Sequence, residues 1–320
     1  MKVLFGPIGT GLEKAIPQLR ERHTDIEFAH CPNREDVAEA IADVDIYVGH
    51  LNADIFNAAK NLKWIQSPSS GVNMYVQIPG LVASDVLLTS AAGTHGPGLA
   101  ESTLGMIFAF TRGIRTSIFR QQEHVWAQRE LRPQLSELTG TTMGIIGFGA
   151  FGRHLAERAQ VFGVNIFAVD LYPANKPDYV NKLLNMEHLD DLLRESDYVV
   201  IALPITPETD NLIDADKIAL MKPTAMIVAM SRGGIVDQDA VAQALQEKRL
   251  GAAALEVTRP EPLPADSYLW DVENLLITAH IAGGTQHEGQ YVLDIFTENL
   301  ERFLAGNFPL RNQVNKEEGF

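Results

Sequence analysis

A glycine-rich turn near the middle of the chain restricts its fold more than any other feature. Residues 147–152 read G-F-G-A-F-G, follow an apolar run at residues 143–146 and precede a segment with helical spacing at residues 153–162. A second apolar run covers residues 164–169 and is followed directly by Asp170. This order of strand, glycine turn, helix, strand and acid is typical of dinucleotide-binding domains. We therefore predict a dinucleotide-binding domain that begins well inside the chain.

Each glycine of the turn has its own physical role. Gly147 permits the tight turn, Gly149 lets the backbone approach a pyrophosphate, and Gly152 lets the helix pack closely on the strand. Free N–H groups and the positive dipole end of the following helix then favour a bound phosphate. Ala150 and Phe151, between the glycines, complete the predicted cofactor-binding turn. The alternative is a glycine turn in an α/β fold that binds nothing.

Asp170 predicts which nicotinamide cofactor is bound. A carboxylate at this point accepts hydrogen bonds from ribose hydroxyls and repels the 2′-phosphate of NADP. Residues 171–173, Leu-Tyr-Pro, offer no cation to pair with that phosphate. We therefore predict NAD as the cofactor rather than NADP.

A second glycine-rich segment, residues 6–11, follows an apolar strand near the N-terminus. Its glycines lack the G-x-G-x-x-G spacing, and Pro7 has no N–H to offer a phosphate. We predict an ordinary strand-to-helix turn here, with Thr10 as the cap of the following helix.

Composition excludes several classes of function. The 320 residues suffice for two domains, and the net charge of −15 argues against binding nucleic acid or anionic membranes, which require a basic face. Cys31 is the only cysteine, so no intramolecular disulfide can form and a reducing, cytoplasmic setting is expected. No apolar run reaches the length of a membrane span, the N-terminal run ends too early for a signal peptide, and no metal site is expected.

Alternating strand and helix patterns predict an α/β chain with two doubly wound parallel sheets. Before the glycine turn, strands are expected at residues 2–5, 26–30, 45–48, 62–66 and 87–90. From the turn onward, strands are expected at residues 142–146, 165–169, 198–202, 225–229, 252–256 and 275–278. The predicted architecture is a Rossmann NAD-binding domain and a flavodoxin-like substrate domain, with a cleft between the two domains.

Two long helical patterns mark the expected domain boundaries. One covers residues 97–115, and the other begins after Thr285 and is expected to pack back onto the first domain. The predicted substrate domain is therefore discontinuous and combines residues 1–97 with 287–320. The predicted NAD-binding domain covers residues 98–286.

Residues 117–138 form a polar stretch that includes Trp126. The stretch is either an arm that lies over a neighbouring subunit or an ordinary surface connection, and the sequence does not decide between them. We expect a homodimer.

Three residues suited to acid–base chemistry follow consecutive predicted strands. Arg232, Glu261 and His280 come after the last three strands of the second sheet, and ligands of such sheets bind beyond the carboxyl ends of the strands. A histidine can take a hydroxyl proton, a carboxylate can stabilise the imidazolium, and a guanidinium can hold a substrate carboxylate. Together they suit hydride transfer to or from a 2-hydroxy acid. Singly, His280 could be a core histidine, Glu261 a solvated charge, and Arg232 a partner of Asp237.

Several motifs in order resemble the D-isomer-specific 2-hydroxyacid dehydrogenase family, and the resemblance covers essentially the whole chain. The motifs are residues 147–152, LPITPET at 203–209, SRGGIVD at 231–237, PEPLP at 260–264 and TAHIAG at 278–283. The resemblance implies that His280 is the acid/base, that Glu261 is its partner and that Arg232 binds substrate. Besides the glycine turn and Asp170, it implies cofactor contacts from Leu203, Pro204, Thr209, Met230, Ser231, Arg232, Glu256, His280 and Gly283.

The resemblance also implies where the substrate is held. The backbone N–H groups of Ser70, Gly71 and Val72 match the loop that binds the substrate carboxylate in this family. His95 lies where it either touches the substrate or caps the helix that follows.

The chain departs from the family pattern at a few positions. Glu256 stands where the family usually has Asp near the nicotinamide carboxamide, and Ala279 replaces the usual proline before the histidine. Asn73 and Ala229 also differ from the usual residues. None of these changes removes a predicted catalytic group, so an active enzyme is expected. Formate dehydrogenases resemble this family but carry Gln at the position of Glu261, which favours a substrate whose oxygen gains or loses a proton.

We predict an NAD-dependent oxidoreductase that interconverts a 2-oxo acid and a D-2-hydroxy acid. One alternative is a dehydrogenase of the same fold with another substrate, such as phosphite. Another is an NAD-responsive binding module that resembles the C-terminal binding protein corepressors, which keep the same catalytic residues. The short tail at residues 307–320 argues against the binding module.

Overall fold

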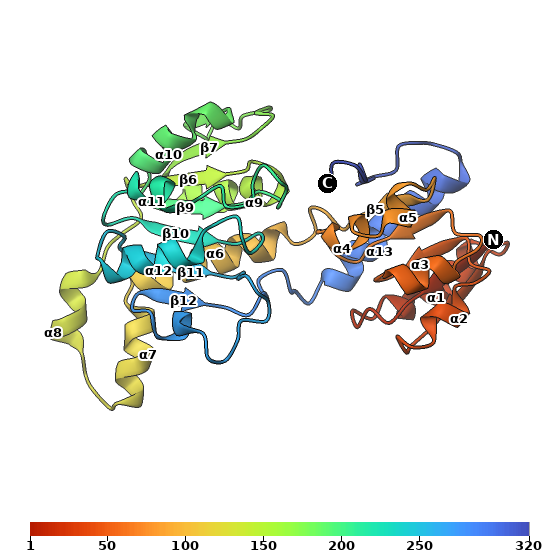
Figure 1. Cartoon of the computed structure of the whole chain (residues 1–320), viewed down its shortest axis with the longest axis horizontal. Helices are drawn as coiled ribbons and strands as arrows, with labels where there is room; N and C mark the ends of the chain where they lie inside the picture. The colour runs from red at the N-terminus through yellow and green to blue at the C-terminus, as the bar shows by residue number, and fades with distance from the viewer. Residues whose placement is uncertain (320) are drawn as a thin grey trace. The chain divides into compact units, whose positions relative to one another are not determined.

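The computed structural model describes residues 1–319, which form two compact units. The first unit comprises Met1–His95 and residues 285–319, and the second comprises Gly96–Gly284. Each unit is built on one parallel β-sheet with helices on both faces (Figure 1). The predicted class, an α/β chain with two parallel sheets, is confirmed.

The first unit has a five-stranded sheet in the order β2-β1-β3-β4-β5. All its strands lie where the sequence predicts them, and their bounds are β1 Lys2–Phe5, β2 Glu27–His30, β3 Ile46–Val48, β4 Trp64–Gln66 and β5 Leu87–Thr89. Each neighbouring pair is parallel, so every strand's carboxyl end lies at the same edge of the sheet. Loops that follow these strands therefore meet at that edge.

Helices cover both faces of the first sheet. Their bounds are η1 Leu12–Ala15, α1 Ile16–Arg22, α2 Val37–Ala40, α3 Ala53–Ala58, α4 Asn73–Val76, α5 Pro79–Val82 and α13 Glu288–Leu304. The last helix, α13, packs on this sheet although it follows the whole second unit in sequence (Figure 1). Phe296 of α13 stacks on Trp64 with ring centroids 5.5 Å apart and meets Phe5 edge-on at 5.4 Å.

The second unit has a seven-stranded sheet in the order β12-β11-β10-β9-β6-β7-β8. Its strands are β6 Thr142–Ile146, β7 Asn165–Val169, β8 Lys182–Leu184, β9 Tyr198–Ile201, β10 Met226–Ala229, β11 Ala252–Leu255 and β12 Leu275–Ile277. The sequence predicted six of them and missed β8. This edge strand has only three residues, too few to establish a period of alternation.

Helices of the second unit cover both faces of its sheet, and three of them lie beyond the sheet without entering its cores. Their bounds are α6 Gly96–Thr111, α7 Ile114–Gln122, α8 Gln128–Leu131, η2 Arg132–Gln134, α9 Ala150–Ala159, η3 Gln160–Phe162, η4 Met186–His188, α10 Leu189–Glu195, α11 Ala215–Ala219, α12 Gln238–Gln246 and η5 Tyr268–Asp271. Ile145 of β6 packs in the core that includes α6 and α9, whereas the next residue, Ile146, packs in the core with α10, α11 and α12. This alternation is that of a strand buried on both faces.

Two local predictions need correction. The helix expected over residues 97–115 ends at Thr111, because Gly113 has a left-handed φ of 65° and separates α6 from α7. The predicted helix cap at Thr10 is wrong. Gly11 is the N-cap of η1, and the Thr10 hydroxyl is buried with no hydrogen-bond partner in the described part of the chain.

None of the helices within residues 1–319 has the length and apolar character of a membrane span.

Gly152 controls how closely α9 approaches the turn after β6. A Cβ atom at this position would lie 2.4 Å from the carbonyl oxygen of Gly147 and 3.2 Å from a side-chain carbon of Ile145. Backbone cannot yield as a flexible side chain can, so a larger residue must push the helix away from the strand.

We expect Gly152→Ala to lower the free energy of unfolding by about 1–3 kcal/mol, because the added carbon overpacks this contact. Gly105 is the matched control, since it lies in α6 with nothing within 4 Å of an added Cβ. Gly105→Ala should raise the unfolding free energy by about 0.5–1 kcal/mol. Urea unfolding followed by circular dichroism measures both changes, and equal shifts would contradict the packing role of Gly152.

Candidate functional site

The glycine turn leaves an open position at the start of α9. Gly147 has a φ of 98°, and a Cβ there would lie 2.8 Å from the carbonyl carbon of Ala202, so only glycine suits this position. Gly149 is the N-cap of α9, and nothing lies within 4 Å of an added Cβ. The first turn of a ten-residue helix therefore presents its N–H groups next to an open position.

Asp170 lies beside this turn, directly after β7. One carboxylate oxygen accepts a hydrogen bond from the Phe148 N–H at 2.6 Å, and the other accepts from the Tyr172 N–H at 2.9 Å. These bonds hold the carboxylate in a fixed orientation while leaving each oxygen a further acceptor position. Asp170 is thus joined to the glycine turn by a direct hydrogen bond.

Arg153, which the sequence analysis did not single out, also contacts the turn. Its guanidinium lies 4.7 Å from the centre of the Phe148 ring and donates to the carbonyl oxygens of Ala174 at 2.6 Å and Asn175 at 2.9 Å. Arg153 therefore ties the start of α9 to the loop that follows Asp170. Only its position after the last glycine could have suggested this contact.

The other predicted cofactor residues lie in loops that follow β9, β10 and β12. The Thr209 hydroxyl donates to the carbonyl oxygen of Pro204 at 2.7 Å, which closes the loop that begins at Leu203. Gly283 is half-buried in the loop after β12, and Met230 is buried in the loop after β10. The hydroxyl of Ser231, the next residue, is buried with no hydrogen-bond partner within residues 1–319. Such an unsatisfied buried hydroxyl fits a site that a ligand completes.

His280 and Glu261 form a direct pair. His280 Nδ1 lies 2.8 Å from Glu261 Oε2, and Glu261 Oε1 accepts a hydrogen bond from the Thr258 N–H at 3.0 Å. The His280 side chain is 47% exposed, so it is not a core histidine. Because Nδ1 is engaged by the carboxylate, Nε2 is the ring nitrogen that faces a possible substrate.

Arg232 lies in the loop after β10, where it feels the negative charge of Glu261. Its Nη1 donates to the carbonyl oxygen of Ser231 at 2.6 Å. Burial lowers the pKa of Arg232 from its ordinary value, and the negative charge of Glu261 acts in the opposite direction. The carboxylate of Asp237 accepts from the Asp239 and Ala240 N–H groups and caps α12. The structure thus brings Arg232, Glu261 and His280 together at the carboxyl edge of one sheet.

Glu256, another of the predicted cofactor residues, is a buried carboxylate at the end of β11. It follows β11 directly and is 1% exposed. Its carboxylate accepts hydrogen bonds from the Thr278 hydroxyl and from the Ala282 N–H. Both donors belong to the segment that carries His280.

The predicted substrate residues other than Arg232 belong to the first unit. Ser70 Oγ lies 2.6 Å from His95 Nδ1 and donates to the carbonyl oxygen of Ala91 at 3.0 Å, which joins the loops after β4 and β5. Gly71 and Val72 follow Ser70, and Val72 is the N-cap of α4. Glu288 Oε1 lies 3.6 Å from His95 Nε2. No sequence signal pointed to Glu288, because it is distant in the chain and joins the loops only through the packing of α13.

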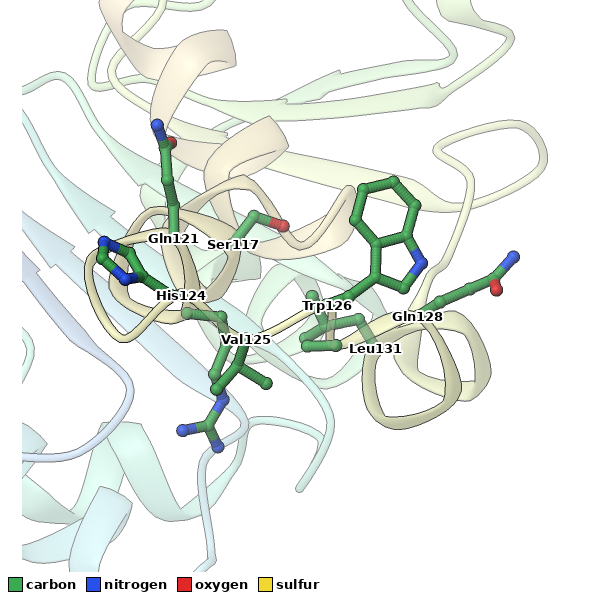
Figure 2. Close-up of a pocket in the computed structure, with 9 residues that line it drawn as sticks. Ser117, Gln121, His124, Val125, Trp126, Gln128 and Leu131 are labelled. Carbon is green, nitrogen blue, oxygen red and sulfur yellow. The ribbon is translucent and has the colours of Figure 1, made fainter.

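A pocket of about 490 Å³ lies elsewhere, between α7 and α8 (Figure 2). It is lined by the polar stretch that the sequence analysis described, and it contains none of the predicted catalytic residues. Trp126 in this pocket is 90% exposed, and Val125 beside it is exposed as well. No group of three His, Cys, Asp or Glu side chains within residues 1–319 is arranged to hold a metal ion.

Comparison with known proteins identifies relatives over the whole chain. The family model described as "D-isomer specific 2-hydroxyacid dehydrogenase, NAD binding domain" matches residues 104–282, which is more than half of the chain. A glyoxylate reductase of Thermofilum pendens is 34% identical over 296 residues, covering 89% of this chain and 86% of the relative. A D-3-phosphoglycerate dehydrogenase of Methanocaldococcus jannaschii is 30% identical over 95% of this chain, and the match spans only 57% of that relative's length.

Solved structures show the same two-unit fold. A D-isomer specific 2-hydroxyacid dehydrogenase from Xanthobacter autotrophicus Py2, in complex with NADPH and MES, has a TM-score of 0.84. It is 25% identical in sequence, and the match covers 100% of this chain and 99% of that one.

Proposed function

The chain belongs to the D-isomer-specific 2-hydroxyacid dehydrogenase family, and we propose that it interconverts a 2-oxo acid and a D-2-hydroxy acid. Family membership confirms the predicted class, an oxidoreductase with an NAD(P)-binding domain. The observation that carries the proposed reaction is the His280–Glu261 pair, 2.8 Å apart, with Arg232 coupled to it. Hydride transfer needs a group that exchanges the hydroxyl proton, and this pair supplies one.

His280 acts as the acid/base in this proposal. Glu261 holds Nδ1, so Nε2 exchanges the proton with the substrate oxygen. The carboxylate stabilises the imidazolium that forms when the hydroxyl proton is taken up. Bound nicotinamide cofactor would supply the hydride donor or acceptor. Arg232 holds the substrate carboxylate and polarises the reacting carbonyl oxygen.

The glycine turn and the loops after β9, β10 and β12 would hold the cofactor. Gly149 offers the open position before α9, and the unpartnered Ser231 hydroxyl offers a donor or acceptor. In the first unit, we assign the substrate carboxylate to the backbone N–H groups of Ser70, Gly71 and Val72, with His95 beside them. Residues 1–97 and 287–320 are thus the proposed substrate domain.

Glyoxylate is the first substrate to test, because one relative is a glyoxylate reductase. We expect His280→Asn to lower kcat by about 10²–10⁴-fold, the usual contribution of a general acid/base. NADH affinity, measured by fluorescence, should change little. The control is His188→Asn, since the exposed side chain of His188 pairs with exposed Asp191 at the start of α10.

The assay follows NADH oxidation with glyoxylate, hydroxypyruvate, pyruvate, and branched and aromatic 2-oxo acids. Full turnover by His280→Asn would contradict its role as acid/base. NADH binding without turnover of any 2-oxo acid would instead favour the binding-module alternative. Turnover of phosphite but of no 2-oxo acid would favour the alternative dehydrogenase of the same fold.

We propose NAD rather than NADP as the cofactor. Asp170 is held beside the glycine turn by two backbone N–H groups, where its charge opposes a 2′-phosphate. Arg153, the cation near this turn, is committed to the carbonyl oxygens of Ala174 and Asn175.

We expect kcat/KM with NADH to exceed that with NADPH by about tenfold or more, because a like-charge contact costs over 1 kcal/mol. Asp170→Asn should reduce this ratio by removing the charge, whereas Asp178→Asn at an exposed position should leave it unchanged. A wild-type preference for NADPH would refute the assignment.

We propose a homodimer that forms through α7 and α8. Five large apolar side chains of this region are exposed, namely Ile114, Ile118, Phe119, Val125 and Trp126. Exposed aromatic and aliphatic groups in one region are typical of an interface, and twofold homodimers are the commonest assembly.

Size-exclusion chromatography with light scattering should show a dimer that Trp126→Ser weakens by at least tenfold in Kd, because a buried Trp is a frequent hot spot. Val161→Ser, at a position 76% exposed elsewhere on the unit, is the control and should leave the dimer intact. A monomer at all concentrations, or a dimer insensitive to Trp126→Ser, would disprove this interface.

A further inference from the structure

Glu256 is a buried carboxylate whose partners all lie on either side of His280. Its two oxygens accept hydrogen bonds from the Thr278 hydroxyl and the Ala282 N–H. Its own carbonyl oxygen accepts from the His280 N–H at 3.1 Å. A carboxylate that is 1% exposed requires such partners, because burial removes its hydration. Glu256 therefore connects the end of β11 to three points of the loop after β12.

The loop needs this support because its backbone conformation is unusual. His280 has a φ of 54°, in the left-handed region that residues other than glycine rarely adopt. The strand before it, β12, has only three residues and lies at the edge of the sheet. Apart from the contacts with Glu256, residues 278–284 donate two backbone hydrogen bonds within the described part of the chain. The Thr278 N–H donates to the carbonyl oxygen of Leu255, and the Gly284 N–H donates to that of Ile281. A strained conformation persists only where its surroundings hold it.

We propose that Glu256 is the positioning residue for His280: its carboxylate fixes Thr278 and Ala282 so that the imidazole stays within reach of Glu261. The proposal rests on the proposed acid/base role of His280. It differs from the cofactor contact expected at this position, because the carboxylate faces the loop and is almost completely buried. The longer side chain of Glu, compared with Asp, provides the reach from β11 to both donors.

The two roles predict different kinetics. A positioning residue affects the proton-transfer step and so lowers kcat, whereas a cofactor contact affects the affinity for NADH. Thr278→Val removes one donor to Glu256 while keeping the shape of the side chain. Glu256→Asp shortens the side chain by one methylene, so that it cannot satisfy both donors. Glu256→Gln keeps the length, and its amide can still accept from the Ala282 N–H and donate to the Thr278 oxygen.

We expect Thr278→Val and Glu256→Asp to lower kcat by about 10- to 100-fold, the range that a displacement on the order of 1 Å causes. The Kd for NADH should change less than about twofold, which is below 0.5 kcal/mol, because most of the proposed cofactor contacts lie in the glycine turn and the loops after β9 and β10. Glu256→Gln should recover most of the activity that Glu256→Asp loses. Thr111→Val is the matched control, since its buried hydroxyl donates only to Ile107 within α6, and it should leave kcat unchanged.

A second measurement does not depend on turnover. Hydrogen exchange followed by mass spectrometry should show faster exchange in peptides covering residues 278–284 for Thr278→Val. Peptides that cover β6 and α9 should keep their protection, which shows that the unit remains folded.

The outcomes separate this inference from the proposed function. If His280→Asn is inactive but Thr278→Val and Glu256→Asp have wild-type kcat, Glu256 does not position His280. A raised Kd for NADH with unchanged kcat would assign Glu256 to the cofactor instead. If the wild type turns over no 2-oxo acid, the proposed reaction fails. In that case, unchanged hydrogen exchange at residues 278–284 in Thr278→Val would by itself overturn the positioning role.

Discussion

Parallel pairing of seven strands, of which the central ones are buried on both faces, is the constraint on which the second unit depends. It aligns the carboxyl ends of all the strands at one edge, so the glycine turn after β6 and the chemical groups after β10, β11 and β12 share that edge. Side chains of β6 illustrate the burial, since Ile145 and Ile146 enter separate cores on the two faces. His280 and Glu261 meet, and Arg232 lies at the same edge, because of this alignment.

The groups at this edge are supported by contacts among the loops themselves. Asp170 is held by backbone N–H groups of the glycine turn and of its own loop. Glu261 is held by the Thr258 N–H and in turn engages His280. Glu256 binds the loop before and after His280. A rigid sheet edge and a second layer of hydrogen bonds are what a preorganised acid–base pair requires.

The sequence predicted much of this arrangement, and its errors have identifiable causes. Strand positions were accessible because buried parallel strands are continuous apolar runs, but β8 is too short to produce one. The long helix was predicted beyond its end because helical spacing continues past the break at Gly113. Threonine is a residue type that often caps helices, yet Gly11 rather than Thr10 occupies the N-cap position of η1. Glu288 carried no signal, since its contact with His95 exists only after α13 packs.

By itself, the sequence determined the order of the elements, the glycine turn after β6 and the kinds of chemical group at the strand ends. These features depend on local spacing, on the conformational freedom of glycine, and on the periodicity of apolar residues. The tertiary structure alone decided which of those groups touch. The partners of Glu256 at Thr278 and Ala282, and the contact of Ser70 with His95, join residues more than twenty positions apart. Such contacts form only when neighbouring strands pair, because only that pairing brings distant loops to one edge.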